Sequence, residues 1–495
     1  MTSDNNPTWV LDMLTKLGYK TNPSGGIVKI GEGLSVTEDG TLSTTKHVFS
    51  ILPLSGTGGR INPDHKVTVD KGDSYHVTIL PDDGYKISNV IVDGISRGAI
   101  SEYTFIDISQ DHYIAASFEE APVYGYAISS SISSPSGCIF YTGESAVLNA
   151  EQRKAKTYGW VKPTIVNRGR IVYDLKRDDL TKKTDGSAAQ LDGTDGDVCA
   201  SFQKLWFRFA PMAGGYIQVN ISETEHAGYI SFHKFNGIIR DWIHLGMFEA
   251  TGTTVNSVYS TTLTPTVSQS LKTFRSQVQA KNADLAEKVY GIETYLTHTM
   301  YQALFIHAYG SLNSQAVVGN GNINTSAAIP VGKADLLTCS GEYGSTTAEN
   351  THVMALFVVN AWGNVWKFME GSMWNTNTFS LATDQADIYD IEAGWAGRPT
   401  SWHTFKPGLA NSTNWGFISK FNGDPYACFF PDTTTGTSDT FACDQAGFNT
   451  GARCCFAGGY WANGADAGLF VLNVYNVPGH LRAGIGARLQ ALDAM

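Results

Sequence analysis

The sequence predicts a mainly β protein with some α-helix. Only 16% of the 495 residues are charged, whereas 12% are aromatic and 51 are glycines, a composition that favours strands joined by tight turns. Many short segments alternate apolar and polar residues with period two, as half-buried strands do. One region, residues 271–308, has apolar residues at helical spacing instead. A chain of this length is expected to form more than one hydrophobic core.

The charge and the cysteines exclude several classes of protein. A net charge of −11 argues against a nucleic-acid partner, which would require a basic surface. No run of about 18 apolar residues occurs, so membrane insertion is not expected. The first residues, MTSDNNPTWVLDML, lack the pattern of a secretory signal. The seven cysteines indicate neither a disulfide framework nor a zinc site, and we expect Cys454 and Cys455 to be buried free thiols in a protein made in the cytoplasm, with no cofactor.

Residues 1–46 form the first expected region, a β-rich N-terminal segment. It contains a short amphipathic stretch, Trp9–Leu14. Residues 33–36 and 38–42 are predicted as two short strands around an Asp-Gly turn. The phrase GEGLSVTEDGTL resembles phrases of phage tail-fibre and baseplate proteins near their virion-attachment end. The resemblance implies a virion-attachment region, and a flexible tail with one hairpin is the alternative.

Residues 47–120 are predicted to form a self-contained β-sandwich. Several short strands separated by turn signals indicate this architecture. The phrases VDKGDS, PDDGYKI and VDG resemble the bacterial Ig-like repeats of surface adhesins, which implies a spacer with no chemistry of its own. The expected strands include Val67–Val69, Tyr75–Ile79, Ile87–Val92, Tyr103–Phe105 and Tyr113–Phe118.

Residues 121 to about 210 open with a Ser-rich linker, followed by a turn-rich acidic segment. The spacing of its aspartates does not match an EF-hand loop, so solvated turns closed by Asx hydrogen bonds are favoured over a calcium site. Leu205–Phe209 is predicted to be an aromatic core strand. The aspartates in question are Asp178, Asp179, Asp185, Asp192, Asp195 and Asp197.

The helical region is followed by strands. Gly291 is a candidate break within residues 271–308, and His298 and His307 are expected to be structural histidines. A block of strands is predicted at Val353–Glu370. The helical spacing is defined by Leu271, Phe274, Val278, Leu285, Val289, Ile292, Leu296, Met300, Leu304 and Ala308.

Three separated phrases point to one family. They are FIHAYGSLNSQ at 305–315, NAWGNVWKFMEG at 360–371, and the series GAR, GGYW and GIGARL within 451–489. Together they resemble the C-type-lectin fold of phage receptor-binding proteins and of the variable proteins of diversity-generating retroelements. The likeness covers most of residues 200–495. It implies an Ig-like β-sandwich followed by a C-type-lectin-like α+β domain at 121–495, with its core at about 200–495.

The residues within these phrases have physical roles of their own. Trp362, Trp366 and Phe368 are predicted to fill the core, with Trp461 buried beneath the surface. Arg453 and Arg488 are expected to brace loops through hydrogen bonds. Positive φ angles or close approaches are expected at Gly458, Gly459, Gly484 and Gly486.

The stretch 458–489 is predicted to present a binding surface. An alternating pattern, typical of a strand with its aliphatic face turned inward, sets residues 471, 473 and 475 against Leu472 and Val474. The same alternation sets residues 480 and 482 against Leu481 and Ala483. No Lys, Glu, Gln or Met lies between Gln445 and Gln490. The resemblance implies a mechanism that randomises adenines in Asn-type codons, and such codons never yield these four residue types. The expected receptor-binding residues are Tyr460, Ala462, Asn463, Asp466, Val471, Asn473, Tyr475, His480 and Arg482.

An enzyme is not predicted. The sequence contains no Gly-x-Ser-x-Gly elbow, HExxH, P-loop or paired CxxC. The contiguous Cys454 and Cys455 depart from the spaced pair that formylglycine-generating enzymes need. A glycan depolymerase would need two placed carboxylates, and the sequence does not distinguish among Asp424, Asp432, Asp439, Asp444 and Asp466.

The sequence therefore predicts a phage or prophage receptor-binding protein at the tip of a tail fibre. Its expected partners are a bacterial cell-surface receptor, either glycan or protein, and other tail or baseplate proteins of the virion. The resemblance implies a homotrimer, in which several weak sites gain avidity. A bacterial surface adhesin or a retroelement-diversified protein is the alternative, and an enzyme of the formylglycine-generating type is the third hypothesis.

Overall fold

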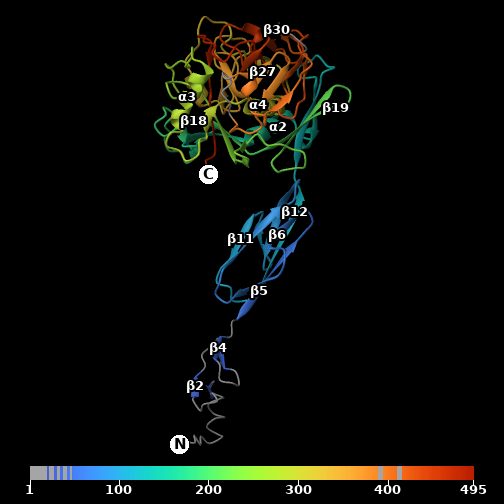
Figure 1. Cartoon of the computed structure of the whole chain (residues 1–495), viewed down its shortest axis with the longest axis vertical. Coiled ribbons are helices and arrows are strands. Elements are labelled where there is room, and N and C mark those ends of the chain that lie inside the picture. Colours follow the sequence, from blue (N-terminus) through green and yellow to red (C-terminus); the bar gives the residue numbers. More distant parts are fainter. Residues whose placement is uncertain are drawn as a thin grey trace, which may run out of the picture. The chain divides into compact units, whose positions relative to one another are not determined.

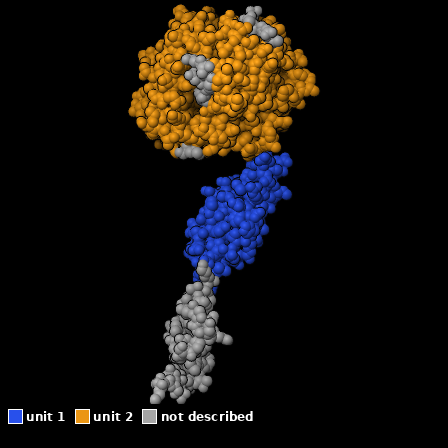
Figure 2. Space-filling view, viewed as in Figure 1, with its two compact units in different colours: residues 1–121 blue, residues 122–495 orange. Residues whose placement is uncertain are grey.

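The computed structural model describes residues 47–387, 394–409 and 415–494, and the backbone of four short strands within residues 1–46 (Figure 1). The chain divides into two compact units, Met1–Ala121 and Pro122–Met495 (Figure 2). Each unit has its own cluster of buried hydrophobic side chains. The elements are mostly strands with a few helices, so the predicted mainly β class with some α is confirmed.

The N-terminal region contains two short antiparallel pairs. β1 (Tyr19–Thr21) pairs with β2 (Ile27–Lys29), and β3 (Leu34–Val36) pairs with β4 (Leu42–Thr44). The predicted pair of strands at 33–42 is therefore confirmed. The Asp-Gly turn between them and the amphipathic stretch Trp9–Leu14 lie outside the described residues, and virion attachment stays a prediction.

Unit 1 is built from two sheets that share one core. The five-stranded sheet has the order β10-β9-β12-β5-β7, and the three-stranded sheet has the order β11-β8-β6. Ile51 and Ile114 from the larger sheet are buried together with Ile61 and Val77 from the smaller one, so the predicted strands form a sandwich. The bounds are β5 (Val48–Ser55), β6 (Gly59–Asn62), β7 (Val67–Asp70), β8 (Tyr75–Pro81), β9 (Tyr85–Val92), β10 (Ile95–Gly98), β11 (Glu102–Phe105) and β12 (His112–Glu120).

Unit 2 contains three larger sheets. The first two have the orders β14-β13-β20-β19 and β17-β16-β15-β18-β23-β37-β24, so the C-terminal strand β37 lies inside the second sheet. The predicted aromatic strand at Leu205–Phe209 corresponds to β19. The bounds are β13 (Val123–Ser129), β14 (Ile139–Gly143), β15 (Val161–Asn167), β16 (Arg170–Lys176), β17 (Asp179–Lys183), β18 (Asp197–Gln203), β19 (Trp206–Met212), β20 (Tyr216–Ser222), β23 (Trp242–Gly246), β24 (Tyr290–Ile292) and β37 (Leu489–Leu492).

The third sheet has the order β29-β28-β27-β34-β35-β33-β30, and β36 pairs with β27 from outside this path. Its central strands are almost entirely buried. The bounds are β27 (Trp366–Asn375), β28 (Thr378–Leu381), β29 (His403–Phe405), β30 (Trp415–Phe417), β33 (Gln445–Phe448), β34 (Ala452–Ala457), β35 (Leu472–Val474) and β36 (Ile485–Gly486). Unit 2 also contains two-stranded sheets of very short strands. They pair β21 (Lys234–Phe235) with β22 (Ile238–Ile239), β25 (Met354–Ala355) with β26 (Val358–Val359), and β31 (Lys420–Phe421) with β32 (Pro431–Thr433).

The helical region contains two helices, and the strand between them includes Gly291, the predicted candidate break. α3 (Leu271–Lys281) ends before β24, and α4 (Tyr295–Tyr309) begins after it. The helical spacing predicted at Leu285, Val289 and Ile292 was wrong, because α3 ends at Lys281 and β24 pairs with β37. The other helices are α2 (Ala150–Gly159), α5 (Ser314–Val317) and the short 3₁₀ segments η1 (Glu144–Ala146), η2 (Ala334–Leu337), η4 (Trp395–Gly397) and η5 (Gly464–Asp466).

α4 is a core helix that packs against α2 and against β27 (Figure 1). Every residue from Tyr295 to Ala308 is buried. His307 hydrogen-bonds Ser145 and Thr157, and His298 hydrogen-bonds Glu293 and the carbonyl of Leu469. The structural role predicted for both histidines is confirmed.

The acidic segment of unit 2 forms turns, as predicted. The Oδ1 atoms of Asp179, Asp185 and Asp192 each accept a backbone N–H from the residue two positions on. Asp197 is instead buried, and its Oδ2 accepts from Lys281 at 2.5 Å. Within the described parts of the chain, no group of three or more metal-ligating side chains is found, and no helix is both long and apolar enough to span a membrane.

Candidate functional site

The predicted binding stretch passes through the interior of the third sheet between two surface loops. β35 lies between β34 and β33 and is buried at all three residues. Val471 and Asn473 were predicted as binding residues but are only 1% and 6% exposed, so that part of the prediction is wrong. Because both faces of this strand are covered, the period-two pattern does not separate an exposed row from a buried one.

Asn473 shapes the turn that follows β35. Its Oδ1 accepts the backbone N–H of Tyr475 at 3.0 Å and the side-chain amide of Asn476 at 3.2 Å. This Asx hydrogen bond bends the chain out of the sheet and places Tyr475 at the surface, where it is 41% exposed. Asn473 therefore positions a candidate binding residue.

A first surface loop, 460–467, carries four predicted residues. Gly458 and Gly459 have φ angles of 89° and 78°, which only glycine adopts readily, and they turn the chain out of β34. Asn463 then accepts the backbone N–H of Tyr460 at 2.9 Å and closes the loop. Ala462 is exposed and Tyr460, Asn463 and Asp466 are half-buried, as is Trp461, which was predicted to be buried.

A second surface loop, 475–484, carries three more of the predicted binding residues, Tyr475, His480 and Arg482. It is irregular, so the alternation predicted for residues 480–483 was wrong: Leu481 is 58% exposed instead of facing inward. Two hydrogen bonds hold the loop over the start of α3, from Ser268 N to the carbonyl of Arg482 and from Leu271 N to that of Pro478. Arg482 is exposed and His480 is half-buried.

The two loops meet at Gly484. A Cβ at this position would overlap the ring of Tyr460, and the Gly484 carbonyl accepts the backbone N–H of Trp366 at 2.8 Å. The end of the second loop therefore packs directly under the aromatic ring that begins the first. This contact joins the start of the first loop to the end of the second.

Four aromatic side chains form the centre of this region. The ring of Tyr460 stacks on Trp366 with centroids 6.5 Å apart and meets Trp461 edge-on at 4.9 Å. Trp366 in turn lies 6.3 Å from Trp415. We refer to Trp366, Trp415, Tyr460 and Trp461 as the aromatic surface.

Trp415 was not predicted, although it is 40% exposed and begins edge strand β30. Its ring covers Gly447 of the neighbouring β33, where a Cβ would overlap it. The available signal was a tryptophan isolated in the polar run NSTNWG, where no apolar periodicity explains a large aromatic residue.

Buried charges hold the framework beneath these loops. Arg488 donates to the carbonyls of Gly246, Met247, Val359 and Asn360, which confirms its predicted bracing role. The half-buried Arg453 differs, because its Nε has no hydrogen-bond partner among the described residues.

Lys367 performs the same function at the start of the first loop. Its ammonium donates to the carbonyls of Asn360 at 2.6 Å and Gly363 at 3.2 Å, and it lies 3.7 Å from the buried carboxylate of Glu249. Burial lowers the pKa of Lys367 to about 8, and the attraction of Glu249 opposes this shift. A Cβ on Gly458 would lie 3.1 Å from this ammonium group, so the turn into the first loop packs on it.

Burial shifts the pKa of two titratable groups in the loops. Burial raises the pKa of Asp466. Burial lowers the pKa of His480, and the positive charge of Arg482 lowers it further. Arg482 is the only Lys or Arg among the nine predicted binding residues.

The two adjacent cysteines lie on β34. Cys454 donates to the carbonyl of Asn476 at 3.5 Å, and burial raises the pKa of Cys455 to about 12. A thiol with this pKa is protonated at neutral pH and is a poor nucleophile. Both are free thiols, as predicted, and so are the other five cysteines.

Among known proteins, no family model matches this chain and no curated protein matches it. The chemistry of the site is therefore inferred from its own residues. Ring faces, indole and phenol donors and one exposed guanidinium make a surface suited to molecular recognition.

Proposed function

We propose that this chain is a phage receptor-binding protein that recognises a bacterial cell-surface receptor through the aromatic surface and the two loops of unit 2. The observation that carries the proposal is the aromatic surface, in which Trp415 and Tyr460 both lie against Trp366, together with the exposed Tyr475 and Arg482 of the second loop. Tyr, Trp and Arg are the residue types that most often dominate interface energetics. They combine a large apolar area with a polar group and lose little side-chain entropy on binding.

The construction of the site supports recognition by preorganisation. Tyr460 is fixed by stacking on Trp366 and by the packing of Gly484, and the turn before it rests on the buried Lys367. A surface held in this way pays little ordering entropy when a ligand binds. Variation at exposed loop positions leaves such a framework unchanged, which suits a surface that must accommodate different receptors.

The other parts of the chain have supporting roles in this proposal. Unit 1 is a sandwich with its own core and acts as a spacer. The N-terminal region attaches the protein to other tail or baseplate proteins of the virion. A homotrimer presents three copies of the aromatic surface, so that individually weak sites reach useful avidity.

The test removes two exposed side chains that the fold does not need. Labelled full-length protein is incubated with a panel of bacterial strains, and a strain that retains it is used for the variants. The double variant Tyr475→Ala/Arg482→Ala is expected to lose at least tenfold in retention, because both groups are exposed in the loop that packs against Tyr460 at Gly484. Its melting temperature is expected to stay within about 2 °C of the parent, since neither side chain contributes to the core.

The matched control is Phe140→Ala, which removes an aromatic side chain of the same exposed fraction, 41%, from β14. It is expected to leave retention unchanged. Equal retention of the double variant and the parent would place the receptor site elsewhere. Retention by no strain, or the absence of the chain from purified phage particles, would overturn the phage assignment and favour a bacterial adhesin or another role.

A further inference from the structure

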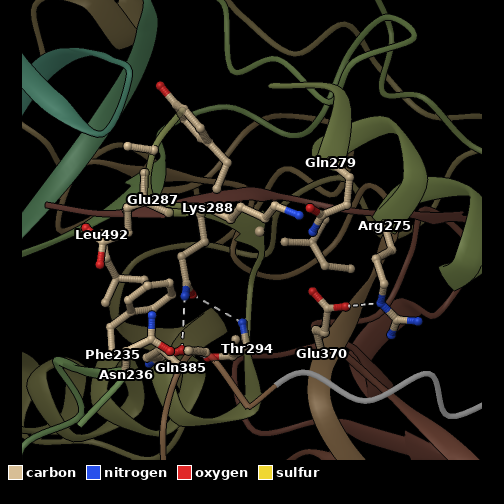
Figure 3. Close-up of a pocket in the computed structure, with 17 residues that line it drawn as sticks. Phe235, Asn236, Arg275, Gln279, Glu287, Lys288, Thr294, Glu370, Gln385 and Leu492 are labelled. Carbon is tan, nitrogen blue, oxygen red and sulfur yellow. Dashed lines mark hydrogen bonds and ion pairs between the residues drawn. The ribbon is translucent and has the colours of Figure 1, made fainter. Parts of the chain in front are cut away.

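Unit 2 contains a cavity of about 600 Å³ that shares no residue with the aromatic surface (Figure 3). Arg275 and Gln279, one turn apart on α3, form one wall. Glu370 of β27 and the β37 residues Gln490 and Leu492 form others. The volume lies within the usual range of small-molecule sites, and polar and apolar groups both contribute to the lining.

The floor is a fixed set of buried polar side chains. Gln385 Oε1 accepts from Thr294 Oγ1 at 2.7 Å and from Gln490 Nε2 at 3.1 Å, and Gln490 Oε1 accepts the backbone N–H of Thr294 at 3.2 Å (Figure 3). Gln385 also donates to the carbonyl of Phe232. These amides are held in one orientation before any ligand arrives.

Gly291 keeps the cavity open. It lies in β24, its φ is not in the left-handed region, and a Cβ there would meet only Glu370 Oε2, at 3.8 Å. Neither backbone conformation nor close packing therefore requires glycine at this position. A glycine weakens a strand relative to alanine, so its presence is explained by the space that it leaves beside Glu370.

Among the described residues, one of the charged side chains in the lining makes no ion pair. Arg275 Nε donates to Glu370 Oε1 at 2.5 Å, and Glu287 is paired with Arg240. Lys288 also lines the cavity, is exposed to solvent, and makes no ion pair within the described parts of the chain. In a chain of net charge −11, this cavity therefore offers a site for an anion.

We propose that the cavity binds a small hydroxylated anion of one or two sugar rings. Its carboxylate or phosphate lies beside the ammonium of Lys288, which forms a charge-assisted hydrogen bond. Its hydroxyl groups donate to Glu370 Oε2, which borders the space above Gly291. Phe235 and Tyr290 in the lining cover the apolar faces of the rings.

The test uses full-length protein and three probes, measured by isothermal titration calorimetry. Sodium glucuronate carries the carboxylate, glucose 6-phosphate carries the phosphate, and glucose is the neutral reference. At least one anionic probe is expected to bind ten times more tightly than glucose. Gly291→Leu is expected to abolish this binding by filling the cavity, and Lys288→Met is expected to remove the preference for the anion over glucose.

Two controls separate occupancy of the cavity from general effects. Gly159→Leu adds the same side chain at the exposed end of α2, where no atom lies within 4 Å of the new Cβ, and Lys406→Met removes one exposed charge elsewhere. Both are expected to bind as the parent does. If neither anionic probe binds, or if both Gly291→Leu and Lys288→Met bind like the parent, the proposal is overturned. Since Lys288 is exposed, its variant remains informative even if Gly291→Leu fails to fold.

The proposal for the cavity and the proposal for the receptor site can be refuted separately. Gly291→Leu and Lys288→Met leave the aromatic surface intact, so cell retention by these variants reports on the receptor site alone. Loss of sugar binding with retention unchanged would show two separate functions. Loss of both would show that the cavity is part of the receptor site.

Discussion

His307 shows how a single buried residue makes the fold sensitive to pH. Thr157 Oγ1 already donates to the carbonyl of Arg153, so it accepts from His307 Nδ1 at 2.7 Å. His307 Nε2 then accepts from Ser145 Oγ at 2.7 Å. This arrangement satisfies a neutral imidazole with its proton on Nδ1, and a second proton on Nε2 would require Ser145 Oγ to stop donating to His307 and accept from it instead.

Acid is therefore expected to destabilise unit 2 through His307. Burial lowers its pKa to about 3, from 6.5 in the unfolded chain. Between these values the unfolded chain binds the extra proton, so stability is complete above pH 6.5 and falls as the pH falls towards 3. At about 1.4 kcal/mol per pH unit, this residue removes about 3 kcal/mol between pH 6.5 and pH 4.

Urea unfolding of the parent and of His307→Gln at several pH values checks this expectation. Glutamine retains a donor and an acceptor but does not titrate. The difference in free energy of unfolding between the two proteins should shrink as the pH falls from 6.5 to 4. A difference that stays constant over this range would show that His307 is protonated normally in the folded state.

Asn473 is a second residue-scale case, because the structure changes its role from binding to positioning. Asn473→Ala leaves the backbone N–H of Tyr475 and the amide of Asn476 without their acceptor. We expect a loss of about 1–3 kcal/mol in the free energy of unfolding, measured by denaturant titration. Ala462→Ser, at an exposed position of the neighbouring loop, should change stability by less than about 0.5 kcal/mol. An equally small effect of Asn473→Ala would contradict the positioning role.

Residue identity predicted core roles better than surface roles. Trp362 and Phe368 are buried as expected, because their size alone makes burial favourable. Val471 was assigned to the surface by its place in an alternating pattern, yet it is buried. Whether a strand has one covered face or two depends on what packs over it, which the local sequence does not record.

At the scale of elements, the region 271–309 shows why spacing alone misplaced a strand. Residues 285, 289 and 292 continue the helical spacing of α3, but Asn282 intervenes. Its side chain accepts the backbone N–H of Tyr290 at 3.0 Å and donates to the Tyr290 carbonyl at 2.8 Å, so it holds β24 beside the end of α3. β24 forms because β37, about 200 residues later, supplies its partner. Pairing at such distance is not visible in a local pattern.

The turn at Gly484 offers an element-scale prediction about the aromatic surface. Its φ is not in the left-handed region, so the backbone tolerates alanine, but the new methyl group would overlap the Tyr460 ring. Gly484→Ala is therefore expected to displace Tyr460 from Trp366 while the sheet remains intact. Near-UV circular dichroism should change, far-UV circular dichroism should not, and retention on bacterial cells should fall at least threefold.

Gly479→Ala is the matched control, because it lies in the same loop with no atom within 4 Å of the new Cβ. It should leave the near-UV spectrum and cell retention unchanged. An unaltered near-UV spectrum for Gly484→Ala would show that Tyr460 is not held as described. A changed spectrum with full retention would instead show that the receptor does not contact this ring.

At the scale of the whole molecule, the two units have separate cores, and each should unfold on its own. Ile114 is fully buried in the core of unit 1, and Ile114→Ala is expected to cost about 2–5 kcal/mol. Differential scanning calorimetry of the full chain should show one transition moving to lower temperature while the transition of unit 2 stays fixed. Leu54→Ala, on the exposed part of β5, should move neither transition. A shift of both transitions with Ile114→Ala would mean that the units unfold together.

Unit 1 was predictable in more detail than unit 2. Its strands follow one another with short turns, and residues such as Ile114 and Val77 mark the covered face by local alternation. In unit 2 the third sheet joins β27 and β34, which are about 80 residues apart, and β33 and β35 pair in parallel. Its long-range pairings bring Trp415 beside Trp366, so the aromatic surface became visible only in the folded chain.

The separate core of unit 2 leads to a prediction about receptor binding by a fragment. Residues 122–495 contain the aromatic surface, both loops and their buried framework, so this fragment should fold and compete with the full-length protein for cells. Because the proposed homotrimer gains avidity from several sites, the fragment should need at least a tenfold molar excess if assembly depends on residues before 122. Analytical ultracentrifugation of both proteins establishes their assembly states, and flow cytometry with labelled full-length protein measures the competition. The same fragment with Tyr475→Ala/Arg482→Ala should not compete. A folded fragment that fails to compete at any concentration would show that residues outside unit 2 carry the receptor site.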